Sequence, residues 1–575
     1  MTSTQKHILI TSALPYVNNI PHLGNIVGCV LSADVYSRYL KSNLNTEHKD
    51  TKILFVGGVD EYGTATEMKA QELKITCREL CDMNYTIHKK VYDWFLIDFD
   101  CYGRTSQPNG NPLIPQLEWE HTSITHNIYT QLCNNNYIIE KKEKIMYCSE
   151  IDSYVADRYV IGTCPYCFST KADGDQCDRC GKLLNSNELI EPRYKLNTNY
   201  KLQIRDTTNL YIDTPKIWND NNMTQWFNDN NRWTKTAIDI TNDWIKNGIN
   251  PRSITRDLKW GTIVPDTKQF GDRYSNKVFY VWFDAPIGYI SITQNTLGVE
   301  LSEYWWKNNN TKLVQFMAKD NVPFHSIIFP VTLKGSDYSD IKDTDIVSTN
   351  YLMYEGTKFS KSKGTGLFCD QVMELSKKYN LLPDYWRAYL ISIRPENNDS
   401  NFVMNGVGSF VDFVNNMLIK NIGNLLHRVL SIAFQVKKKK NILFIIKPEH
   451  NTIIDISFNT DIDKLYDMFC ENMDSYRFAN ALRILFDMGS RLNVYINNTE
   501  PWQLIKDSSE LGTTKLYNVV YNLYNNIHRL SYVIEIFMPT IGNNIRNQFT
   551  MNNITIILPL LKPVIMIHPI PNSVL

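Results

Sequence analysis

Residues 7–25, HILITSALPYVNNIPHLGN, decide how the first part of the chain folds. Residues 8–12 begin with three apolar residues, Ile-Leu-Ile, and are typical of a buried strand. A turn rich in proline and asparagine follows, and apolar residues then recur at helical spacing over 22–40. Gly24 lets a ligand approach the backbone, and the first helical turn offers free N–H groups to an anion. The stretch therefore predicts a strand, a turn and a helix that begins at a phosphate-sized site.

The alternation of strands and helices continues along the chain. A second apolar run at residues 53–56 ends in a Gly-Gly pair and is followed by a helical pattern. Strand-like runs return at 279–283 and 313–316. Such alternation implies a parallel sheet with helices on its faces. We therefore expect an α/β, Rossmann-like parallel-sheet domain.

Two other parts of the chain have a different character. Between about residues 128 and 257, short strand patterns, a cysteine cluster and an Asn-rich stretch indicate an inserted domain. After about residue 410, apolar residues recur at three- and four-residue spacing, for instance over 410–430 and 516–536. This pattern predicts an all-α helical bundle.

Composition limits the class of protein without selecting a function. The chain has 575 residues, 43% of them hydrophobic, and a formal net charge of zero, so several domains are expected. A net charge of zero neither favours nor excludes a nucleic-acid partner, because local patches matter more than the sum. No apolar run approaches the roughly 20 residues of a membrane helix. The short polar N-terminus leaves no room for a signal peptide, so we expect a cytoplasmic protein without disulfides.

Four of the twelve cysteines form one compact cluster. They occur as two CxxC pairs with nine residues between the pairs, a spacing that lets all four thiolates meet at one tetrahedral metal. The expected ligands of this zinc ion are Cys164, Cys167, Cys177 and Cys180. Four protein ligands leave no open coordination position, so the zinc would be structural. A redox role is the alternative, but the sequence lacks a thioredoxin-like setting.

A second basic motif lies more than 300 residues after the first helix. KFSKSKG at residues 358–364 is a lysine-, serine- and glycine-rich loop whose lysines can neutralise a departing pyrophosphate. His22 and Asn25 stand three residues apart on the first helical turn, hence on one face. Alone, that pair is a weak signal, since a buried or surface histidine explains it equally well. The two motifs together favour a nucleotide site.

These two motifs resemble the HIGH and KMSKS signatures of class I aminoacyl-tRNA synthetases. Within that class, the chain is similar to the methionyl-tRNA synthetases along essentially its whole length, and its KFSKS and DNVPFHS forms resemble eukaryotic cytosolic members. The matches keep their order along the chain: ALPYVNNIPHLGN at 13–25, GVDEYGTATE at 58–67, the CxxC pairs, ITRD at 254–257, FYVWFDAPIGY at 279–289, AKDNVPFHS at 318–326 and KFSKS at 358–362.

The resemblance implies a division into five segments. These are the first half of the catalytic Rossmann-like domain (1–127), an inserted connective domain with the zinc knuckle (128–265), the second catalytic half (266–350), a KMSKS-loop region (351–410) and an anticodon-binding helical domain (411–575). Where some relatives have a second knuckle, Cys148 stands alone and Ile151 occupies the next expected place. One zinc ion is therefore expected.

The resemblance also assigns roles to residues of this chain. Catalysis would use His22, Asn25, Lys358 and Lys361, and Gly24 and Ser360 would join them in binding ATP. Asp60 would bind the methionine ammonium, with Ala13, Leu14, Tyr16, Trp282, Ala285, Pro286, Tyr289 and His325 around the rest of the amino acid. Arg256 and Asp320 would line the site, although a structural ion pair is the alternative. Trp282 and Tyr289 have the alternative role of core aromatics.

Substrates and partners follow from the same resemblance. The methionine carboxylate would attack the α-phosphorus of ATP in line, with Mg²⁺ bridging phosphates, and the 2′-OH of tRNA(Met) would then accept the methionyl group. Asn424, Arg428 and Trp502 match positions that read the anticodon, although Trp502 is also explained as a packing aromatic. Lys420 departs from the family, where an Asn is common. The chain ends without an appended tRNA-binding or dimerisation module, so we expect a monomer.

Three alternatives remain open at this point. A synthetase for leucine, isoleucine or valine is disfavoured, because the chain has no room for an editing insertion between 128 and 257. A degenerate synthetase kept as a tRNA-binding scaffold is disfavoured, because the full set of expected catalytic residues is present. The lysine run at 437–440 is either a solvated loop or a contact to the tRNA backbone.

Overall fold

A five-stranded sheet, parallel throughout, forms the centre of the α/β part of the molecule. Its order is β14-β13-β1-β2-β3, and the strands are β1 (His7–Ser12), β2 (Lys52–Val59), β3 (Cys101–Arg104), β13 (Thr311–Ala318) and β14 (Asp343–Thr349). In the register, Ile8 lies opposite Ile53 on one side and Lys312 on the other. The strands expected at 8–12, 53–56 and 313–316 are thus confirmed.

The structure is a computed structural model of the whole chain. It describes residues 6–42, 44–106, 119–155, 159–174, 177, 179–180, 184, 186–230, 232–338, 343–359, 365–440, 451–550 and 553–554. Ser360 and Lys361 lie outside this described part. For Lys440, the last residue of the lysine run, only the backbone is described.

The run at 279–283 is not a strand of the sheet, so that expectation was wrong. Residues Val278–Phe279 form β12, which pairs antiparallel with β11 (Thr255–Arg256), and α9 (Val281–Asp284) starts immediately afterwards. A short continuous apolar run is compatible with either a buried strand or a helix, and here tertiary packing decides. The change to helix carries Trp282 toward the cavity described below.

Alternate residues of β1 enter two different cores. Ile8 and Ile10 pack in the core that contains α2 (Leu31–Lys41), whereas Leu9 packs in the core that contains α5 (Glu120–Asn134) and α10 (Gly288–Leu297). Successive side chains of a strand point to opposite faces, so a continuous apolar strand must be covered on both. Helices therefore lie on both faces of the sheet.

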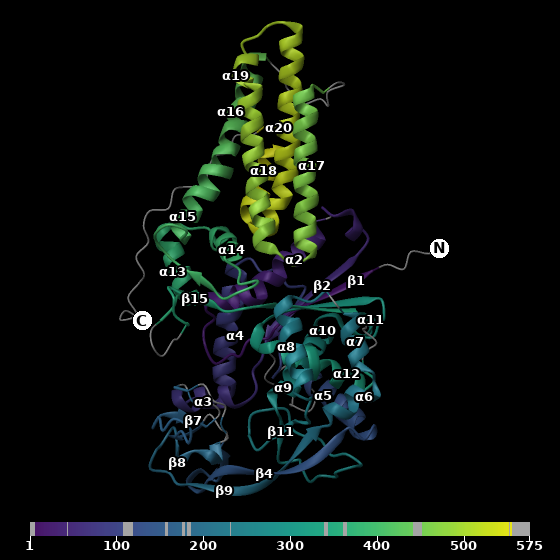
Figure 1. Ribbon diagram of the computed structural model, residues 1–575, viewed down its shortest axis with the longest axis vertical. Helices are drawn as coiled ribbons and strands as arrows, with labels where there is room; N and C mark the ends of the chain where they lie inside the picture. The colour runs from purple at the N-terminus through teal and green to yellow at the C-terminus, as the bar shows by residue number, and fades with distance from the viewer. Residues whose placement is uncertain are drawn as a thin grey trace.

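The inserted part of the chain is mainly antiparallel β-structure. A four-stranded sheet runs in order β10-β9-β4-β5 and a three-stranded sheet in order β7-β6-β8. The strands are β4 (Ile138–Cys148), β5 (Ser153–Val155), β6 (Val160–Thr163), β7 (Ala172–Asp173), β8 (Ile190–Tyr194), β9 (Leu202–Ile212) and β10 (Arg252–Ser253). These sheets form the end of the molecule opposite the long helices in Figure 1. The expected start of the insertion at residue 128 falls within α5.

Long helices form the other end of the molecule (Figure 1). They are α16 (Asn424–Lys440), α17 (Ile453–Asp474), α18 (Phe478–Thr499) and α20 (Glu510–Phe537), with the short α19 (Pro501–Leu504) between the last two. The predicted helices over 410–430 and 516–536 are confirmed, although residues Val414–Gly423 are π-helical. Within the described part of the chain, no helix has the length and apolar character needed to cross a membrane.

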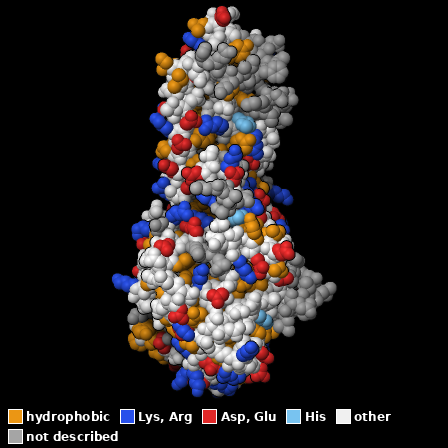
Figure 2. All heavy atoms as spheres, turned by 90° about the vertical axis from the view of Figure 1, so that its right-hand side faces the viewer, with side chains coloured by type: hydrophobic (Ala, Val, Ile, Leu, Met, Phe, Trp, Pro, Cys, Tyr) orange, Lys and Arg blue, Asp and Glu red, His pale blue; other side chains and the backbone are white. Residues whose placement is uncertain are grey.

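One core joins the bundle to the sheet. The cluster that holds Ile8 and Val314 of the sheet also holds Leu485 of α18 and Ile534 of α20. In Figure 1, α2 and α14 (Pro383–Ser392) lie between the sheet and the bundle. Figure 2 shows acidic and basic side chains interspersed over one face of the whole length, in keeping with the net charge of zero.

Candidate active site

A cavity of about 400 Å³ opens where β1 and β2 end. Its walls include Ala13 and Tyr16, which follow β1, and Asp60, which follows β2. Strand order reverses between β1 and β13, and open parallel sheets bind ligands outside the carboxyl ends of their strands at such a point. A second cavity of about 290 Å³ shares Leu14, His22 and other residues with the first. The fold thus forms the site at the place that its topology favours.

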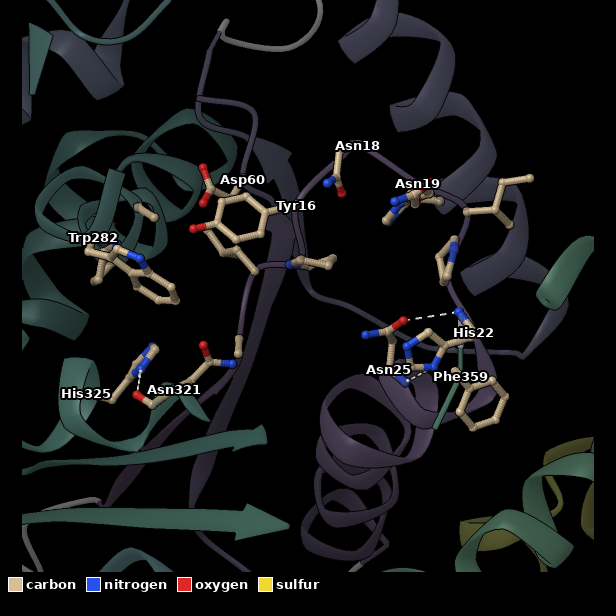
Figure 3. Close-up of a pocket in the computed structure, with 18 of the residues that line it drawn as sticks. Tyr16, Asn18, Asn19, His22, Asn25, Asp60, Trp282, Asn321, His325 and Phe359 are labelled. Atoms are coloured by element: carbon tan, nitrogen blue, oxygen red, sulfur yellow. Dashed lines mark hydrogen bonds between the residues drawn. The ribbon is translucent and has the colours of Figure 1, made fainter. Parts of the chain in front are cut away.

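One end of the first cavity combines an acid with apolar and aromatic walls. Tyr16, Asp60, Trp282 and His325 lie together on one side in Figure 3. The ring of Trp282 is stacked on Phe324 with centroids 3.7 Å apart, and Tyr16 meets Trp282 edge to face at 6.0 Å. Further walls come from Leu14, Ala285, Pro286 and Tyr289. The nine residues expected around methionine all line this cavity.

Asp60 is buried, and its carboxylate accepts a hydrogen bond from the neighbouring backbone. The N–H of Tyr62 donates to Asp60 Oδ1 at 3.4 Å. Burial, and after it the neighbouring carboxylate of Asp284, raise the pKa of Asp60 well above its usual range. An ammonium group placed beside Asp60 would favour its ionised form, so the carboxylate and a positively charged ligand stabilise each other here.

His325 is a neutral wall residue with both ring nitrogens occupied. Its Nδ1 lies 2.9 Å from the carbonyl oxygen of Asn321, which can only accept, so Nδ1 carries the proton. Its Nε2 lies 2.8 Å from the hydroxyl of Tyr289 and accepts from it. Burial lowers the pKa of His325 to about 4, in keeping with a neutral ring. The imidazole therefore has no free N–H to offer to a thioether sulfur.

The other end of the cavity is the start of the first helix. His22 caps it: Nδ1 accepts from the backbone N–H groups of Gly24 at 3.1 Å and Asn25 at 3.3 Å. Asn25 Oδ1 in turn accepts from the N–H of His22 at 3.1 Å. Since Nδ1 accepts, the ring proton sits on Nε2, and burial lowers the pKa of His22 to about 4. A neutral N–H donor is thus available to a phosphate oxygen.

Gly24 packs closely against this cap. A Cβ on Gly24 would lie 3.0 Å from two atoms of the His22 ring, tighter than ordinary contact. A larger residue would therefore push the imidazole that caps the helix by a small distance. This supplies a packing reason for the glycine beyond access to the backbone.

The start of the KFSKS motif reaches the same helix. Phe359 stacks on His22, with ring centroids 4.5 Å apart and an angle of 8° between the planes. Lys358 is exposed, and its Nζ lies 5.0 Å from the ring centroid of Tyr351 in the wall of the second cavity. The fold therefore brings together two motifs that the chain separates by more than 300 residues. Ser360 and Lys361 lie outside the described residues.

Asp320 and Arg256 are placed differently from each other. Asp320 lines the second cavity and accepts from the hydroxyl of Tyr351 at 2.5 Å. Arg256 instead lines a separate cavity beside Glu143, with its guanidinium 3.7 Å from the ring centroid of Tyr280. It is not among the residues that line the two cavities described above.

Several lining residues had not been expected from the sequence. They are Asn18, Asn19, His88, Asn321, Phe359 and Phe368. Asn18 and Asn19 stand in the turn within residues 7–25, between the predicted strand and the phosphate-sized site. Polar residues at that place could have been predicted to line the cavity. His88, from α4 (Cys77–Trp94), had no such signal, because only the packing of that helix brings it to the cavity.

The four cysteines of the two CxxC pairs converge as expected. Their sulfur atoms all lie within 4.8 Å of one another. Cys164 and Cys180 are 3.9 Å apart and Cys167 and Cys177 are 3.6 Å apart, close to the roughly 3.8 Å edge of a tetrahedron with zinc–sulfur bonds of about 2.3 Å. The backbone N–H of Cys180 is the main cause that lowers the pKa of Cys177 to about 7, which favours a thiolate. The donor set and its spacing fit zinc.

The residues expected to contact an anticodon lie on the bundle. Asn424 is exposed at the start of α16, and Trp502 in α19 is 39% exposed, so it is not a fully buried packing residue. Arg428 donates to Asn493 Oδ1 at 2.9 Å and to Asn497 Oδ1 at 2.6 Å. All three belong to α16 or α19, at the helical end of the molecule (Figure 1). None of them is among the residues that line the two cavities.

Comparison with known proteins agrees with this architecture. The family described as tRNA synthetases class I (M) matches residues 8–430. The chain is 39% identical to "Probable methionine--tRNA ligase, cytoplasmic" of Dictyostelium discoideum, over 95% of this chain and 69% of that protein. It is 41% identical to "Methionine--tRNA ligase" of Acanthamoeba polyphaga mimivirus, over 87% of this chain and 84% of that protein. Against the human cytoplasmic enzyme the identity is 37%, and the chain spans only 57% of that protein's length.

A solved structure supports the fold. Methionyl-tRNA synthetase of Mycobacterium tuberculosis, in complex with methionyl-adenylate, superposes with a TM-score of 0.72 over 99% of both chains at 18% identity. At that identity the likeness speaks for the fold alone. The family match over residues 8–430 and the relatives near 40% identity show that the chain belongs to the methionyl group of the class I tRNA synthetases.

Proposed function

We propose that this chain is a methionine–tRNA ligase that activates L-methionine with ATP and transfers it to tRNA(Met), for translation initiation and elongation. The observation that carries the proposal is that one cavity has walls suited to both substrates, the amino acid and the phosphates of ATP. Asp60 and the aromatic walls suit an amino acid with an apolar side chain, and the capped helix start suits a phosphate. Both lie at the carboxyl edge of one sheet.

Activation needs positioning more than acid–base chemistry. The methionine carboxylate is ionised at neutral pH, so it attacks the α-phosphorus without a general base, and the bond from the α-phosphorus to pyrophosphate breaks. His22 Nε2–H and the amide of Asn25 would hold phosphate oxygens, and Lys358 and Lys361 would neutralise the departing pyrophosphate. Mg²⁺ would enter bound to ATP. Asp320 lines the second cavity, which shares His22 and Asn25 with the first.

Transfer and anticodon recognition belong to the second half of the reaction. The 2′-OH of the terminal ribose would attack the carbonyl of the adenylate and release AMP. Asn424, Arg428 and Trp502 would contact the anticodon, where a partly exposed tryptophan can stack on an unpaired base. We further propose that the enzyme acts as a monomer in the cytoplasm, with tRNA affinity that falls as salt rises.

We also propose one structural zinc ion held by Cys164, Cys167, Cys177 and Cys180. The four sulfur atoms supply the full coordination of the ion, which would stabilise the knuckle rather than take part in catalysis. Cys148 lies outside this set, and its thiol is directed to Glu150 at 3.4 Å.

The decisive experiment is ATP–pyrophosphate exchange against each of the twenty amino acids, without tRNA. Exchange with methionine alone is the expected result. Exchange with leucine, isoleucine or valine would move the protein to another specificity within the class. Folded, zinc-loaded protein that exchanges with no amino acid would favour the tRNA-binding scaffold.

A further inference from the structure

Three polar residues form one stripe on α4, the helix that reaches the cavity wall through His88. Asn84, His88 and Tyr92 are spaced by four residues, so they share one face of the helix. All three are buried, and His88 is only 1% exposed. Buried polar side chains need hydrogen-bond partners, and for two of these three the partners lie in the turn at residues 17–21, between β1 and the first helix.

The stripe holds two backbone carbonyls of this turn. The side-chain amide of Asn84 donates to the carbonyl of Val17. Nε2 of His88 lies 3.0 Å from the carbonyl oxygen of Asn19, which can only accept, so Nε2 carries the ring proton and donates it. One helix thus holds the turn at two points, two residues apart.

Both ring nitrogens of His88 are engaged by the protein. The hydroxyl of Tyr92 lies 3.4 Å from Nδ1 and donates to it, since Nε2 holds the ring proton. Burial lowers the pKa of His88 to about 4, in keeping with a neutral ring. Although His88 lines the cavity, its nitrogens are therefore not free for a ligand. Its influence on a bound nucleotide would pass through the turn.

The turn is the wall between the two ends of the cavity. Figure 3 shows Asn18 and Asn19 between Tyr16 and His22. Just before His22, the carbonyl of Pro21 accepts from the backbone N–H of Cys369, the first residue of α13 (Cys369–Tyr379), at 2.9 Å. The turn thus leads directly into the helix cap proposed to hold phosphate oxygens. The lining residues of the turn are Asn18, Asn19, Ile20 and Pro21.

The methionine end of the cavity is fixed by other contacts. The N–H of Asp60 donates to the carbonyl of Pro15 at 2.9 Å, and the N–H of Val17 donates to the carbonyl of Asp60 at 3.2 Å. These two bonds hold Tyr16 beside the end of β2 without help from α4. Loss of the contact between His88 and Asn19 should therefore disturb the nucleotide end and leave the methionine end in place.

We propose that His88 is a positioning residue for ATP: it holds the turn at Asn19, while Asn84 holds the same turn at Val17. The inference rests on the proposed function, since it concerns the same cavity. It adds to the two signature motifs a third segment, α4, that determines how well ATP binds.

The test is ATP–pyrophosphate exchange by His88→Leu, which fills the helix face with an apolar side chain but has no donor for the carbonyl of Asn19. The ATP KM should rise about tenfold, the size expected for the loss of one hydrogen bond to a buried group. The methionine KM should stay within about threefold of wild type. An equal rise of both constants, or an ATP KM within about threefold of wild type, overturns the inference.

His88→Gln separates the hydrogen bond from packing. A glutamine amide places an N–H donor near the position of the imidazole Nε2. The ATP KM of H88Q should therefore be at least about threefold lower than that of H88L. A folded glutamine variant that is no better than H88L indicates a packing role and also overturns the inference.

A second site and a control complete the test. Asn84→Leu removes the donor to Val17, so it too should raise the ATP KM more than the methionine KM, and it replaces H88L if that variant does not fold. A folded N84L with the ATP KM of wild type refutes the inference. Lys89→Met, exposed on the same helix, should behave as wild type.

The wild-type enzyme must exchange with methionine first. If it does not, the proposed function fails. Active wild type with an unaffected H88L refutes this inference alone.

Discussion

At the scale of single residues, the site contains two neutral histidines and one acid, Asp60. A positively charged ligand would stabilise the ionised form of Asp60. His325 is buried and His22 is half-buried, and desolvation lowers the pKa of each to about 4. Their tautomers follow from the groups that each ring nitrogen faces. His22 is left with an N–H directed away from the helix, while His325 has both nitrogens in use. Asp60 is the group that we propose binds the ammonium of the amino acid.

Replacing Asp60 by asparagine tests that role. Loss of a charge-assisted hydrogen bond in a buried site should raise the methionine KM by about 10- to 100-fold. The KM for ATP should be nearly unchanged, because the capped helix start is intact. Steady-state pyrophosphate exchange measures both constants. A methionine KM within threefold of wild type would show that another group holds the ammonium.

The buried histidines also predict how stability depends on pH. His88 has a pKa lowered by burial to about 4, with Nε2 3.0 Å from the carbonyl of Asn19. Between pH 4 and about 6.5 the unfolded chain binds this proton and the folded chain does not, so stability falls as the pH falls through that window. For His88 alone the loss between pH 7 and pH 5 is about 2 kcal/mol.

Urea unfolding of His88→Asn at the two pH values checks this. The variant should lose less stability than wild type between pH 7 and pH 5, because asparagine does not titrate there. His427→Asn, at an exposed position of α16, is the control and should follow wild type. An equal loss in all three proteins would mean that burial does not lower the pKa of His88 below its value in the unfolded chain.

At the scale of elements, the proposed zinc knuckle is a small unit in which the four cysteines converge. Its core includes Cys164 and Cys177 and packs against Met68 of α3 (Thr64–Leu73), the helix that follows Asp60. The hydroxyl of Tyr194 in β8 also donates to Oε1 of Gln71 in the same helix, at 3.5 Å. The knuckle therefore supports the helix next to the proposed methionine site.

Metal analysis should find one zinc ion per chain. Cys177→Ser/Cys180→Ser should retain none, since two ligands of a four-cysteine site are lost. Without the metal, limited trypsin digestion should cut at Lys171 or Arg179, both exposed within the knuckle. Cys148→Ser is the matched control and should keep the full zinc content. Loss of zinc in that control would mean that Cys148 is a ligand.

The position of Trp502 on the helical bundle predicts that its loss affects the transfer of methionine to tRNA and not the activation of methionine. Trp502→Ala should lower kcat/KM for aminoacylation of tRNA(Met) by about 5- to 100-fold, the range for loss of one base-stacking contact. Pyrophosphate exchange without tRNA should be unchanged. Met468→Ala, exposed on α17, is the control on the same bundle and should leave aminoacylation intact. Equal loss in both variants would point to a general effect on the bundle.

At the scale of the whole molecule, a fully buried arginine joins the bundle to the catalytic part. Arg387 of α14 donates to the carbonyls of Phe537 at the end of α20 and Phe95 at the end of α4, at 2.9 and 2.8 Å. It also forms an ion pair of 2.6 Å with Asp34 of α2, and both side chains are completely buried. One side chain thus connects three helices that are far apart in the sequence.

Arg387→Met should lower the free energy of unfolding by about 3–5 kcal/mol, because it leaves Asp34 with less compensation and two carbonyls without a donor. Arg529→Met removes an exposed ion pair with Asp463 and should change stability by less than about 1 kcal/mol. Urea unfolding of both variants gives the comparison. A small effect in Arg387→Met would mean that the packed core alone holds the bundle to the sheet.

Much of this molecule was predictable from local patterns. Mainly apolar runs located β1, β2 and β13, since a strand buried on both faces is rich in apolar residues. Spacing of three and four located the bundle helices. The CxxC pairs located the cysteine cluster, because residues close in sequence need little help from the rest of the fold to meet.

The remaining features depend on tertiary structure, because they arise between segments that are distant in the chain. Packing decided that residues 281–284 are helical and that Arg256 lies in a cavity of its own. Only the folded chain brings His88 to the cavity wall and stacks Phe359 on His22. The sequence by itself determined the elements and the residue types of the site, whose signals are local. The tertiary structure decided protonation, because charge and tautomer depend on which groups burial places against each nitrogen and carboxylate.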